Sequence, residues 1–389
     1  MISEKIISAA VSTGVSAKKI WLKHALERET LELMKAGHGS QGNDRELRKA
    51  YHDFALPYWK RYGRRPKFFW FKCYGSRDGI IHPGFIPADI YYTELVPYLN
   101  DMRKAPGQED KCRFEMFLSD VRQSVTICRR ISGEYYDKEM QYLRERDAIS
   151  LCLERLSNGT DIIIKKAVQS DYGSGITIVR AGSFAEEGGR TGESFKDRIR
   201  ELFRKSGSGF IVQEMLRQHP SLDVLCPTAV STIRVCSLFF GGEVYMPAMS
   251  FRSAVAGREF IGGDKGTWSA EILDDGRLYP VAVYENGEID RIDNKERFDP
   301  DFMIPGMEEL REIVRNAHKQ LPDFRWIGWD FAIADDGRPV MLEYNLRPSN
   351  DTQRVICKPI FGDMTETVLE DYFHGRSLEE NHSQLIMLQ

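Results

Sequence analysis

The side chains best suited to chemistry lie near the C-terminal end, in the stretch WIGWDFAIADDGRPVMLEYN, residues 326–345. Asp330 comes before a turn at the Asp-Gly pair 336–337, and Glu343 and Asn345 come after it. If the turn is a two-residue loop, antiparallel pairing places Asp330 directly opposite Glu343. Because side chains alternate between the two faces of a sheet, all three polar side chains then lie on one face.

The same pairing makes predictions for the neighbouring residues. Gly328 faces Asn345 and, lacking a side chain, leaves room for an ion or a phosphate. The opposite face is apolar and is expected to carry Trp329, Phe331, Leu342 and Tyr344. A bulge at Arg338 or Pro339 would shift this register by one residue.

Two carboxylates placed opposite each other repel unless they are solvated or share a cation. A cation site built from Asp330, Glu343 and Asn345, without His or Cys, suits Mg²⁺ or Mn²⁺ better than zinc. Since Mg²⁺ usually takes its remaining ligands from water and phosphate, such a site would indicate a nucleoside triphosphate. The alternative is the solvated face of a half-exposed strand, and this segment alone leaves both interpretations open.

A second set of residues is suited to holding phosphate. The stretch DIIIKKAVQSDYGSGITIV contains an apolar strand ending in Lys165 and Lys166, followed by a loop with Gly173 and Gly175. Backbone N–H groups of such a loop can cover phosphate oxygens while a strand lysine adds positive charge. The Walker pattern of NTPases is not present, and Gly-Ser-Gly alone is more often a plain hairpin turn. Either lysine could be the phosphate contact.

Three further cations stand in segments with weaker signals. Lys111 lies in DKCRFEMF, which also has the pattern of an ordinary charged helix start. Arg234 and Arg252 are expected on neighbouring strands joined by a turn at 241–242. Two such arginines can neutralise a transferring phosphoryl group or hold a substrate carboxylate, although a strand arginine is more commonly a surface ion-pair partner.

Composition bounds the class of protein. The 389 residues exceed one ordinary domain, and 42% apolar with 29% charged residues is typical of globular proteins. The formal net charge of −4 gives no basic excess for nucleic acid. Seven cysteines without a Cys-x-x-Cys pair predict neither a disulfide framework nor a zinc site. No apolar run approaches the ~20 residues of a membrane span, so a cytoplasmic protein is expected.

Helices and strands in a mixed order must position these residues. Apolar spacing predicts helices at 16–36, from Asn43 or Asp44 towards Gly63 with a kink at Pro57, at 149–159, 194–205 and 307–321. Turn pairs at 241–242, 275–276, 286–287 and 336–337 predict a mainly antiparallel sheet in the last part of the chain. We expect a mostly helical N-terminal region (1–105), a lobe with the Gly-rich loop (106–210) and a lobe with the metal site (211–389).

Taken in order, these segments resemble the ATP-grasp superfamily, and within it the sugar-transfer-associated ATP-grasp group, related to α-L-glutamate-ligase-like proteins. The resemblance covers roughly residues 85–355. It is carried by IPADIYYTELVPYLND, DKCRFEMF, IIIKKAVQSDYGSGI, FIVQEMLRQHP, AVSTIRVCS, GWDFAI and VMLEYN. It implies an α+β fold in which two lobes hold ATP between them.

Residue by residue, the resemblance implies roles for these positions. Lys111 and Lys165 would contact ATP phosphates, with Gly173 and Gly175 in the loop above them. Gln213, Glu214, Met215 and Leu216 would form the hinge that reads the adenine edge. Asp330, Glu343 and Asn345 would hold Mg²⁺ or Mn²⁺, and Arg234 and Arg252 would lie near the γ-phosphate and the acyl phosphate.

The activity that this resemblance implies is an ADP-forming carboxylate–amine ligase that works through an acyl phosphate. Its substrates would be a small carboxylate and an amine, such as an amino acid, a sugar acid or a glycan precursor, in glycan or natural-product biosynthesis. Two alternatives stay open: a small-molecule or sugar kinase, and a non-catalytic nucleotide-binding accessory protein. The sequence is also compatible with an oligomer.

Overall fold

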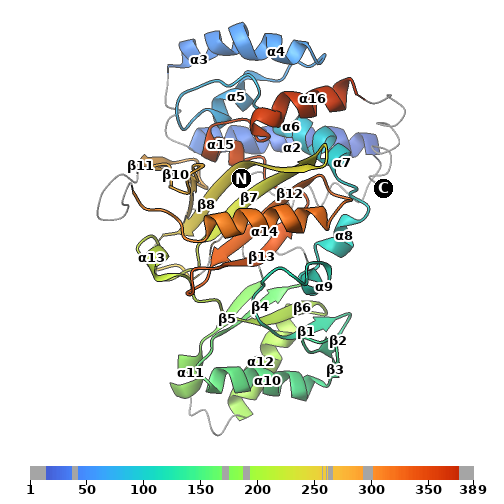
Figure 1. Ribbon diagram of the computed structural model, residues 1–389, viewed down its shortest axis with the longest axis vertical. Helices are drawn as coiled ribbons and strands as arrows, with labels where there is room; N and C mark the ends of the chain where they lie inside the picture. Colours follow the sequence, from blue (N-terminus) through green and yellow to red (C-terminus); the bar gives the residue numbers. More distant parts are fainter. Residues whose placement is uncertain are drawn as a thin grey trace.

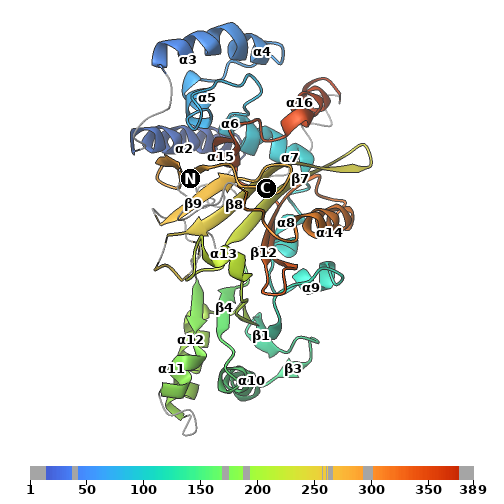
Figure 2. The ribbon, with the colours of Figure 1, turned by 60° about the vertical axis from the view of Figure 1, so that its left-hand side comes forward.

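The computed structural model describes residues 15–36, 43–168, 175–186, 193–255, 257–259, 261, 266–291 and 301–375. It is an α+β protein with two antiparallel sheets and a layer of helices from the N-terminal part of the chain (Figure 1). The smaller sheet and its helices lie at one end of the long axis, the larger sheet in the middle and the N-terminal helices at the other end (Figures 1 and 2).

Among the described residues, the first sheet has six strands in the order β3-β2-β1-β6-β4-β5. The strands are β1 (Thr126–Ile131), β2 (Glu134–Tyr136), β3 (Tyr142–Leu143), β4 (Ile162–Lys166), β5 (Ile176–Val179) and β6 (Phe210–Glu214). The helices of this lobe are α10 (Glu145–Ser157), α11 (Ala181–Glu186) and α12 (Glu193–Ser206). Apolar side chains of the helices and strands form one core, which includes Ile162, Ile164, Ile199 and Phe203.

The second sheet, in the part of the chain that the structure describes, has seven strands in the order β11-β10-β9-β8-β7-β12-β13. They are β7 (Thr232–Phe240), β8 (Glu243–Ala254), β9 (Thr267–Glu271), β10 (Val281–Tyr284), β11 (Ile289–Arg291), β12 (Trp326–Ile333) and β13 (Pro339–Asn345). The predicted amphipathic helix is α14 (Met307–Lys319), which packs on one face of this sheet with Leu310 and Val314 in the core. The short helix α13 (Pro220–Asp223) precedes the first of these strands.

The N-terminal helices are α2 (Val15–Ala36), α3 (Asp44–Ala50), η1 (Tyr51–Ala55), α4 (Leu56–Lys60), α5 (Phe68–Tyr74), α6 (Ala88–Ile90), η2 (Tyr91–Leu95), α7 (Val96–Leu99), α8 (Ala105–Gln108) and α9 (Phe114–Phe117). The predicted kink at Pro57 takes the form of a π-helical turn, η1, in which Leu56 donates to the carbonyl of Tyr51. A second π-turn, η2, precedes Pro97 in the same way. A widened turn suits a following proline, which has no N–H to donate.

These helices share a core with the second sheet. Trp59 and Phe85 belong to the same buried cluster as Trp326 and Ala248 of the sheet and Phe361 near the C-terminal end. The helices α15 (Thr352–Ile356) and α16 (Thr365–Phe373), with the short turn η4 (Gly362–Met364), complete this layer (Figure 1). The N-terminal region is therefore part of the larger lobe's folding unit, while the predicted limits at 105 and 210 stay predictions.

The hairpin β12–β13 has the predicted residue pairs, but one residue, Leu342, does not have the predicted apolar environment. Asp330 pairs with Glu343, and Gly328 pairs with Asn345. The turn is one residue longer than predicted, since Ala334 donates to the carbonyl of Arg338, and a bulge at Leu342 compensates for it. The predicted apolar position of Leu342 was wrong, because the bulge leaves it half-buried and Met341 occupies the core beside Phe331.

Candidate active site

The polar residues of the hairpin continue as a row across the sheet. Glu343 on β13 pairs with Asp330 on β12, which pairs with Arg234 on β7. Arg234 pairs in turn with Ser250 on β8. Directly paired residues of an antiparallel sheet place their side chains on the same face, so these groups lie side by side on the face opposite α14.

Asp330 and Arg234 form a buried, two-pronged ion pair. Arg234 Nε donates to Asp330 Oδ1 at 2.7 Å and Nη2 donates to Oδ2 at 2.8 Å. Burial opposes the charge of the guanidinium, but Asp330 outweighs it and raises the pKa of Arg234 above its ordinary value. Asn345 Nδ2 donates to Asp330 Oδ2 at 3.3 Å. The three side chains are thus held in one fixed arrangement.

Glu343 meets lysines from the other sheet and from the segment that joins the lobes. Lys111 Nζ lies 2.8 Å from Glu343 Oε2. Burial would raise the pKa of Glu343, yet Lys111, Arg234 and Lys165 together lower it to about 2. Burial also lowers the pKa of Lys165 to about 8, with Glu343 opposing and Lys111 adding to the effect. Three cations and two carboxylates from both lobes are therefore electrostatically coupled.

The structure separates the two candidate lysines of β4. Lys165 alternates with the buried Ile162 and Ile164, which places it on the face that interacts with Glu343. Lys166 lies against Gly175, where a Cβ would come within 2.8 Å of the Lys166 side chain. Gly175 also has a φ of +82°, which favours glycine. Gly173 lies outside the described residues.

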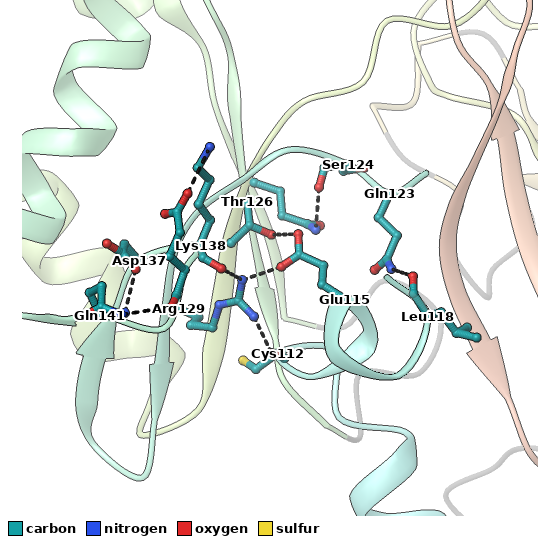
Figure 3. Close-up of polar contacts among 12 residues, drawn as sticks. Cys112, Glu115, Leu118, Gln123, Ser124, Thr126, Arg129, Asp137, Lys138 and Gln141 are labelled. Atoms are coloured by element: carbon teal, nitrogen blue, oxygen red, sulfur yellow. Dashed lines mark hydrogen bonds and ion pairs between the residues drawn. The ribbon is translucent and has the colours of Figure 1, made fainter. Parts of the chain in front are cut away.

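The segment that carries Lys111 is anchored on the smaller sheet (Figure 3). The backbone N–H of Lys111 donates to Ala167. Arg129 on β1 is buried, donates through Nη1 to the carbonyl of Cys112 at 2.6 Å and forms an ion pair with Glu115 on α9. Thr126 Oγ1 donates to the same carboxylate at 2.8 Å. These contacts fix the backbone position of Lys111 relative to the smaller sheet.

The predicted hinge lies at the end of β6. Gln213 pairs with Ile163 inside the sheet, and Glu214 forms an ion pair with Arg155 at 2.9 Å. The N–H groups of Glu214 and Met215 donate to the carbonyls of Val125 and Asp161. In the described part of the chain Leu216 is then the hinge position whose N–H donates to no other residue.

Arg252 is not brought to the Asp330–Glu343 pair. It lies on the same sheet face but donates to Glu285 Oε1 at 3.3 Å, just beyond β10. Glu285, Asp351 and Arg354 were not predicted from the sequence. The charges of Asp351 and Arg354 act on Glu285, the partner of Arg252. Asp351 lies shortly after the hairpin, but nothing in the sequence pattern shows that β10 and α15 meet there.

The donor set fits a hard divalent cation. Glu343 engages Lys111 through one oxygen, and the Asn345 amide uses its NH₂ group towards Asp330, which directs its oxygen elsewhere. Asp330 retains lone pairs beyond those used by Arg234, since a carboxylate has about four acceptor sites. No group of three His, Cys, Asp or Glu side chains suited to a metal occurs among the described residues. A cation here would therefore need phosphate or water oxygens as well, which is the habit of Mg²⁺.

Comparison with known families identifies the class. The model of the family described as sugar-transfer associated ATP-grasp matches residues 91–361. The chain belongs to this family. A search of curated proteins found no match. No helix of the described chain combines the length and apolarity that crossing a bilayer requires.

Several solved structures are similar at low sequence identity. D-alanyl-alanine synthetase A from Vibrio cholerae is 11% identical with a TM-score of 0.36, over 72% of this chain and 64% of that one. The VanG D-Ala:D-Ser ligase from Enterococcus faecalis is 16% identical with a TM-score of 0.39, over 68% and 61%. The D-cycloserine synthetase DcsG is 13% identical with a TM-score of 0.39, over 69% and 73%. The chain spans less than two thirds of the length of the first two.

Proposed function

We propose that the protein is an ATP-dependent, ADP-forming ligase that joins a small carboxylate to an amine through an acyl phosphate. Membership of the ATP-grasp family indicates that the nucleotide is ATP, bound with Mg²⁺. The observation that carries the proposal is the coupling of Lys111, Lys165 and Arg234 to Glu343 and Asp330 across two lobes. Phosphoryl transfer depends on such positioning and charge neutralisation more than on a protein nucleophile.

In the proposed reaction the positively and negatively charged residues have different roles. Lys111 and Lys165 bind phosphate oxygens of ATP, and Arg234, held in place by Asp330, neutralises the phosphoryl group as it moves to the substrate carboxylate. Leu216 and the hinge carbonyls orient the adenine. Asp330, Glu343 and Asn345 would hold Mg²⁺, which would screen the charge of the phosphates. The amine then displaces phosphate from the acyl phosphate.

The substrates fall within small molecules of amino-acid, sugar-acid or glycan-precursor type, and we place the reaction in glycan or natural-product biosynthesis. The family's association with sugar transfer supports this range of substrates.

An isotope experiment tests the reaction. Carboxylates labelled with ¹⁸O in both oxygens are incubated with ATP, Mg²⁺ and amines in pairs chosen by a screen for ADP release. In a ligase one carboxylate oxygen leaves on phosphate, so labelled inorganic phosphate appears together with ADP and the amide. ADP formed with a phosphorylated product, without free phosphate, would instead identify a kinase.

Glu343→Gln provides the negative control, because it removes a charge that Lys111, Lys165 and Arg234 share. We expect ADP release to fall by roughly 100-fold or more, and the melting temperature to fall as well, because Lys111 loses its carboxylate partner. Glu309→Gln is the matched control, since Glu309 is partly exposed and pairs with Arg338 on the surface. Equal turnover in the two variants would contradict the proposed site.

A further inference from the structure

A helical segment from Asp44 to Lys60 lies across one end of the molecule. It consists of α3, η1 and α4 in succession, and at about 1.5 Å per residue it is about 25 Å long. In Figures 1 and 2 it lies at the end of the long axis opposite the smaller lobe. The candidate active site, which is built from both sheets, is not at this end.

One side of the segment packs into the protein and the other side faces solvent. The buried residues recur every four positions: Leu47, Tyr51, Ala55 and Trp59. Arg45 and Lys49 are also four residues apart, so they lie together on the side opposite Leu47 and Tyr51. Both are exposed, as are Phe54 and Lys60 further along. We call these four exposed residues, Arg45, Lys49, Phe54 and Lys60, the end face.

The part of the chain that contains the end face has a positive charge that the overall composition conceals. Residues 43–75 contain nine lysines and arginines and three aspartates and glutamates, a formal charge of +6. The whole chain carries −4, so the remaining residues carry −10, the difference between −4 and +6. A local positive excess in an acidic protein indicates a surface for an anionic partner.

The cations of the end face keep their charge available for such a partner. Other cations in this layer have carboxylate partners, and Arg61, for example, lies 2.6 Å from Glu366 near the start of α16. Among the described residues, Arg45, Lys49 and Lys60 take part in no ion pair. Their charges are therefore not neutralised by neighbouring carboxylates.

Phe54 indicates what kind of anionic partner fits. Its side chain is 62% exposed and lies on η1, between the cations of α3 and the end of α4. Helices that bind at a membrane surface combine lysines and arginines, which contact the lipid headgroups, with aromatic or leucine side chains that enter the acyl boundary. The end face has both components.

A lipid surface also suits the segment better than a nucleic acid does. The segment exposes two carboxylates, Glu46 and Asp53, in addition to its cations. A groove of nucleic acid encloses a helix from both sides and would bring fixed phosphates against these carboxylates. Lipids diffuse within their layer, so anionic headgroups gather under the cations and neutral lipids take the positions beside the carboxylates.

We propose that the end face docks on an anionic membrane surface. Arg45, Lys49 and Lys60 contact the headgroups, and Phe54 inserts between them. Each lysine or arginine near an anionic bilayer strengthens binding by about fivefold. Docking at this end of the long axis leaves the candidate active site uncovered (Figure 2).

Vesicle flotation with the full-length protein tests the docking. Vesicles of phosphatidylcholine alone are compared with vesicles that also contain about 30% phosphatidylserine. We expect binding to the anionic vesicles and not to the neutral ones, and weaker binding as salt is raised from about 50 mM to about 300 mM. A double-stranded oligonucleotide is titrated under the same conditions as the alternative polyanion.

A pair of double variants tests the cations. Arg45→Gln combined with Lys49→Gln should weaken binding to the anionic vesicles by about 25-fold. Arg204→Gln combined with Lys205→Gln removes the same charge from exposed positions on α12, in the smaller lobe at the other end of the molecule. This control should bind like the parent protein. Equal affinity of the two double variants would refute the end face as the docking surface.

The apolar contact is tested by Phe54→Gln, which should weaken vesicle binding by about tenfold. Tyr142→Gln, at an exposed position on β3, is its control and should have no effect. Vesicle binding that is unchanged in Phe54→Gln would refute insertion and so overturn the proposed docking.

Two further results would also overturn it. One is the absence of binding to anionic vesicles at about 50 mM salt. The other is binding of the oligonucleotide without binding of vesicles, which would assign the end face to nucleic acid. Since all the altered side chains are exposed, the melting temperature and ADP release in solution should match those of the parent protein in every variant.

Discussion

Lys165 differs from an ordinary lysine because burial lowers the pKa of its ammonium to about 8. Its charge is therefore present below that pH and lost as the pH rises through it. Because Lys165 is proposed to bind ATP phosphates, we expect kcat/KM for ATP to fall above pH 8, whereas a normal lysine would stay charged to about pH 10. Steady-state kinetics from about pH 6.5 to about pH 9.5, in buffers of about equal ionic strength, would measure this fall.

The variant Lys165→Arg separates this lysine from other titrating groups. An arginine keeps its charge throughout the range, so the fall above pH 8 should disappear even if the absolute rate is lower. Lys166→Arg is the matched change on the neighbouring residue and should keep the fall. A profile that is the same in both variants would assign the pH dependence to another group.

At this scale the sequence predicted pairs of neighbours better than distant partners. Asp330 and Glu343 face each other because the longer turn and the bulge at Leu342 cancel, so a simple count along the hairpin succeeds. That Arg234 holds Asp330 was not predictable, because it depends on β7 lying beside β12 rather than on spacing in the chain. The contact between Arg252 and Glu285 was not predictable for the same reason.

The packing of α14 on the sheet includes a buried histidine. His318 Nε2 donates to the carbonyl of Phe324, so its Nδ1 accepts from the hydroxyl of Ser237, which also accepts from Trp329 Nε1. Burial lowers the pKa of His318 from 6.5 to about 4. The folded protein therefore binds fewer protons than the unfolded chain between these two values, and the free energy of unfolding falls as the pH is lowered through them.

We expect the protein to be less stable at pH 5 than at pH 7 by about 2 kcal/mol from this residue alone. Urea denaturation at both pH values measures the difference. In His318→Gln the pH-dependent part should shrink, although the variant is less stable overall. The exposed His374, on the C-terminal side of α16, provides the control His374→Gln. An undiminished difference in His318→Gln would refute the assignment.

The link between α9 and β1 depends on Arg129. Replacing this buried arginine by methionine leaves Glu115 without its guanidinium partner and frees the carbonyl of Cys112. We expect the free energy of unfolding to fall by about 3 kcal/mol. ATP binding should also weaken, because the backbone at Lys111 is no longer held in place. Arg146→Met, at an exposed position on α10, should change neither. Calorimetric titration with an ATP analogue and urea denaturation measure the two effects.

Elements with a clear period were the easiest to predict. The predicted helices at 16–36 and 307–321 correspond to α2 and α14. The apolar face of α14 is regular, whereas in α2 Ile20 and Trp21 are exposed and the buried face is formed by Leu22, Ala25 and Leu26. The π-turn η1 was not predictable, because its extra residue is determined by how Tyr51 and Ala55 pack in the core. Propensity describes a residue's local preference and says little about such tertiary contacts.

For the whole molecule, the part of the chain that the family model matches is shorter than the part that shares one hydrophobic core. The match begins at residue 91, yet Leu26, Trp59 and Phe85 are fully buried in a core with the second sheet. We expect a chain starting at residue 91 to lose cooperative unfolding, because it exposes the apolar surface of Trp326 and Phe361. Circular dichroism during thermal unfolding, with size-exclusion chromatography, measures this.

A milder change tests the same interface. Trp59→Ala should destabilise the protein by about 3–5 kcal/mol, since the side chain is fully buried and its Nε1 donates to Pro83. Trp21→Ala, at a half-exposed position on α2, is the control and should have little effect. A stable, ATP-binding protein that lacks residues 1–90 would show that the N-terminal helices are dispensable.

The sequence indicated a helical N-terminal region but not what it packs on. The N-terminal helices lie beside α15 and α16 from the opposite end of the chain (Figures 1 and 2). Tyr98 donates to Asp371, and Asn350 donates to Tyr74. Contacts between such distant residues leave no periodic signal in either segment.

This joining of the two ends has a consequence for synthesis in the cell. The first helices leave the ribosome long before Trp326, Phe361 and Leu369, the residues that bury them, have been translated. Until then their apolar faces stay open to water and to other nascent chains, and the smaller lobe, whose core is its own, is complete first. We expect the N-terminal segment to be the part of the nascent protein that most needs a chaperone.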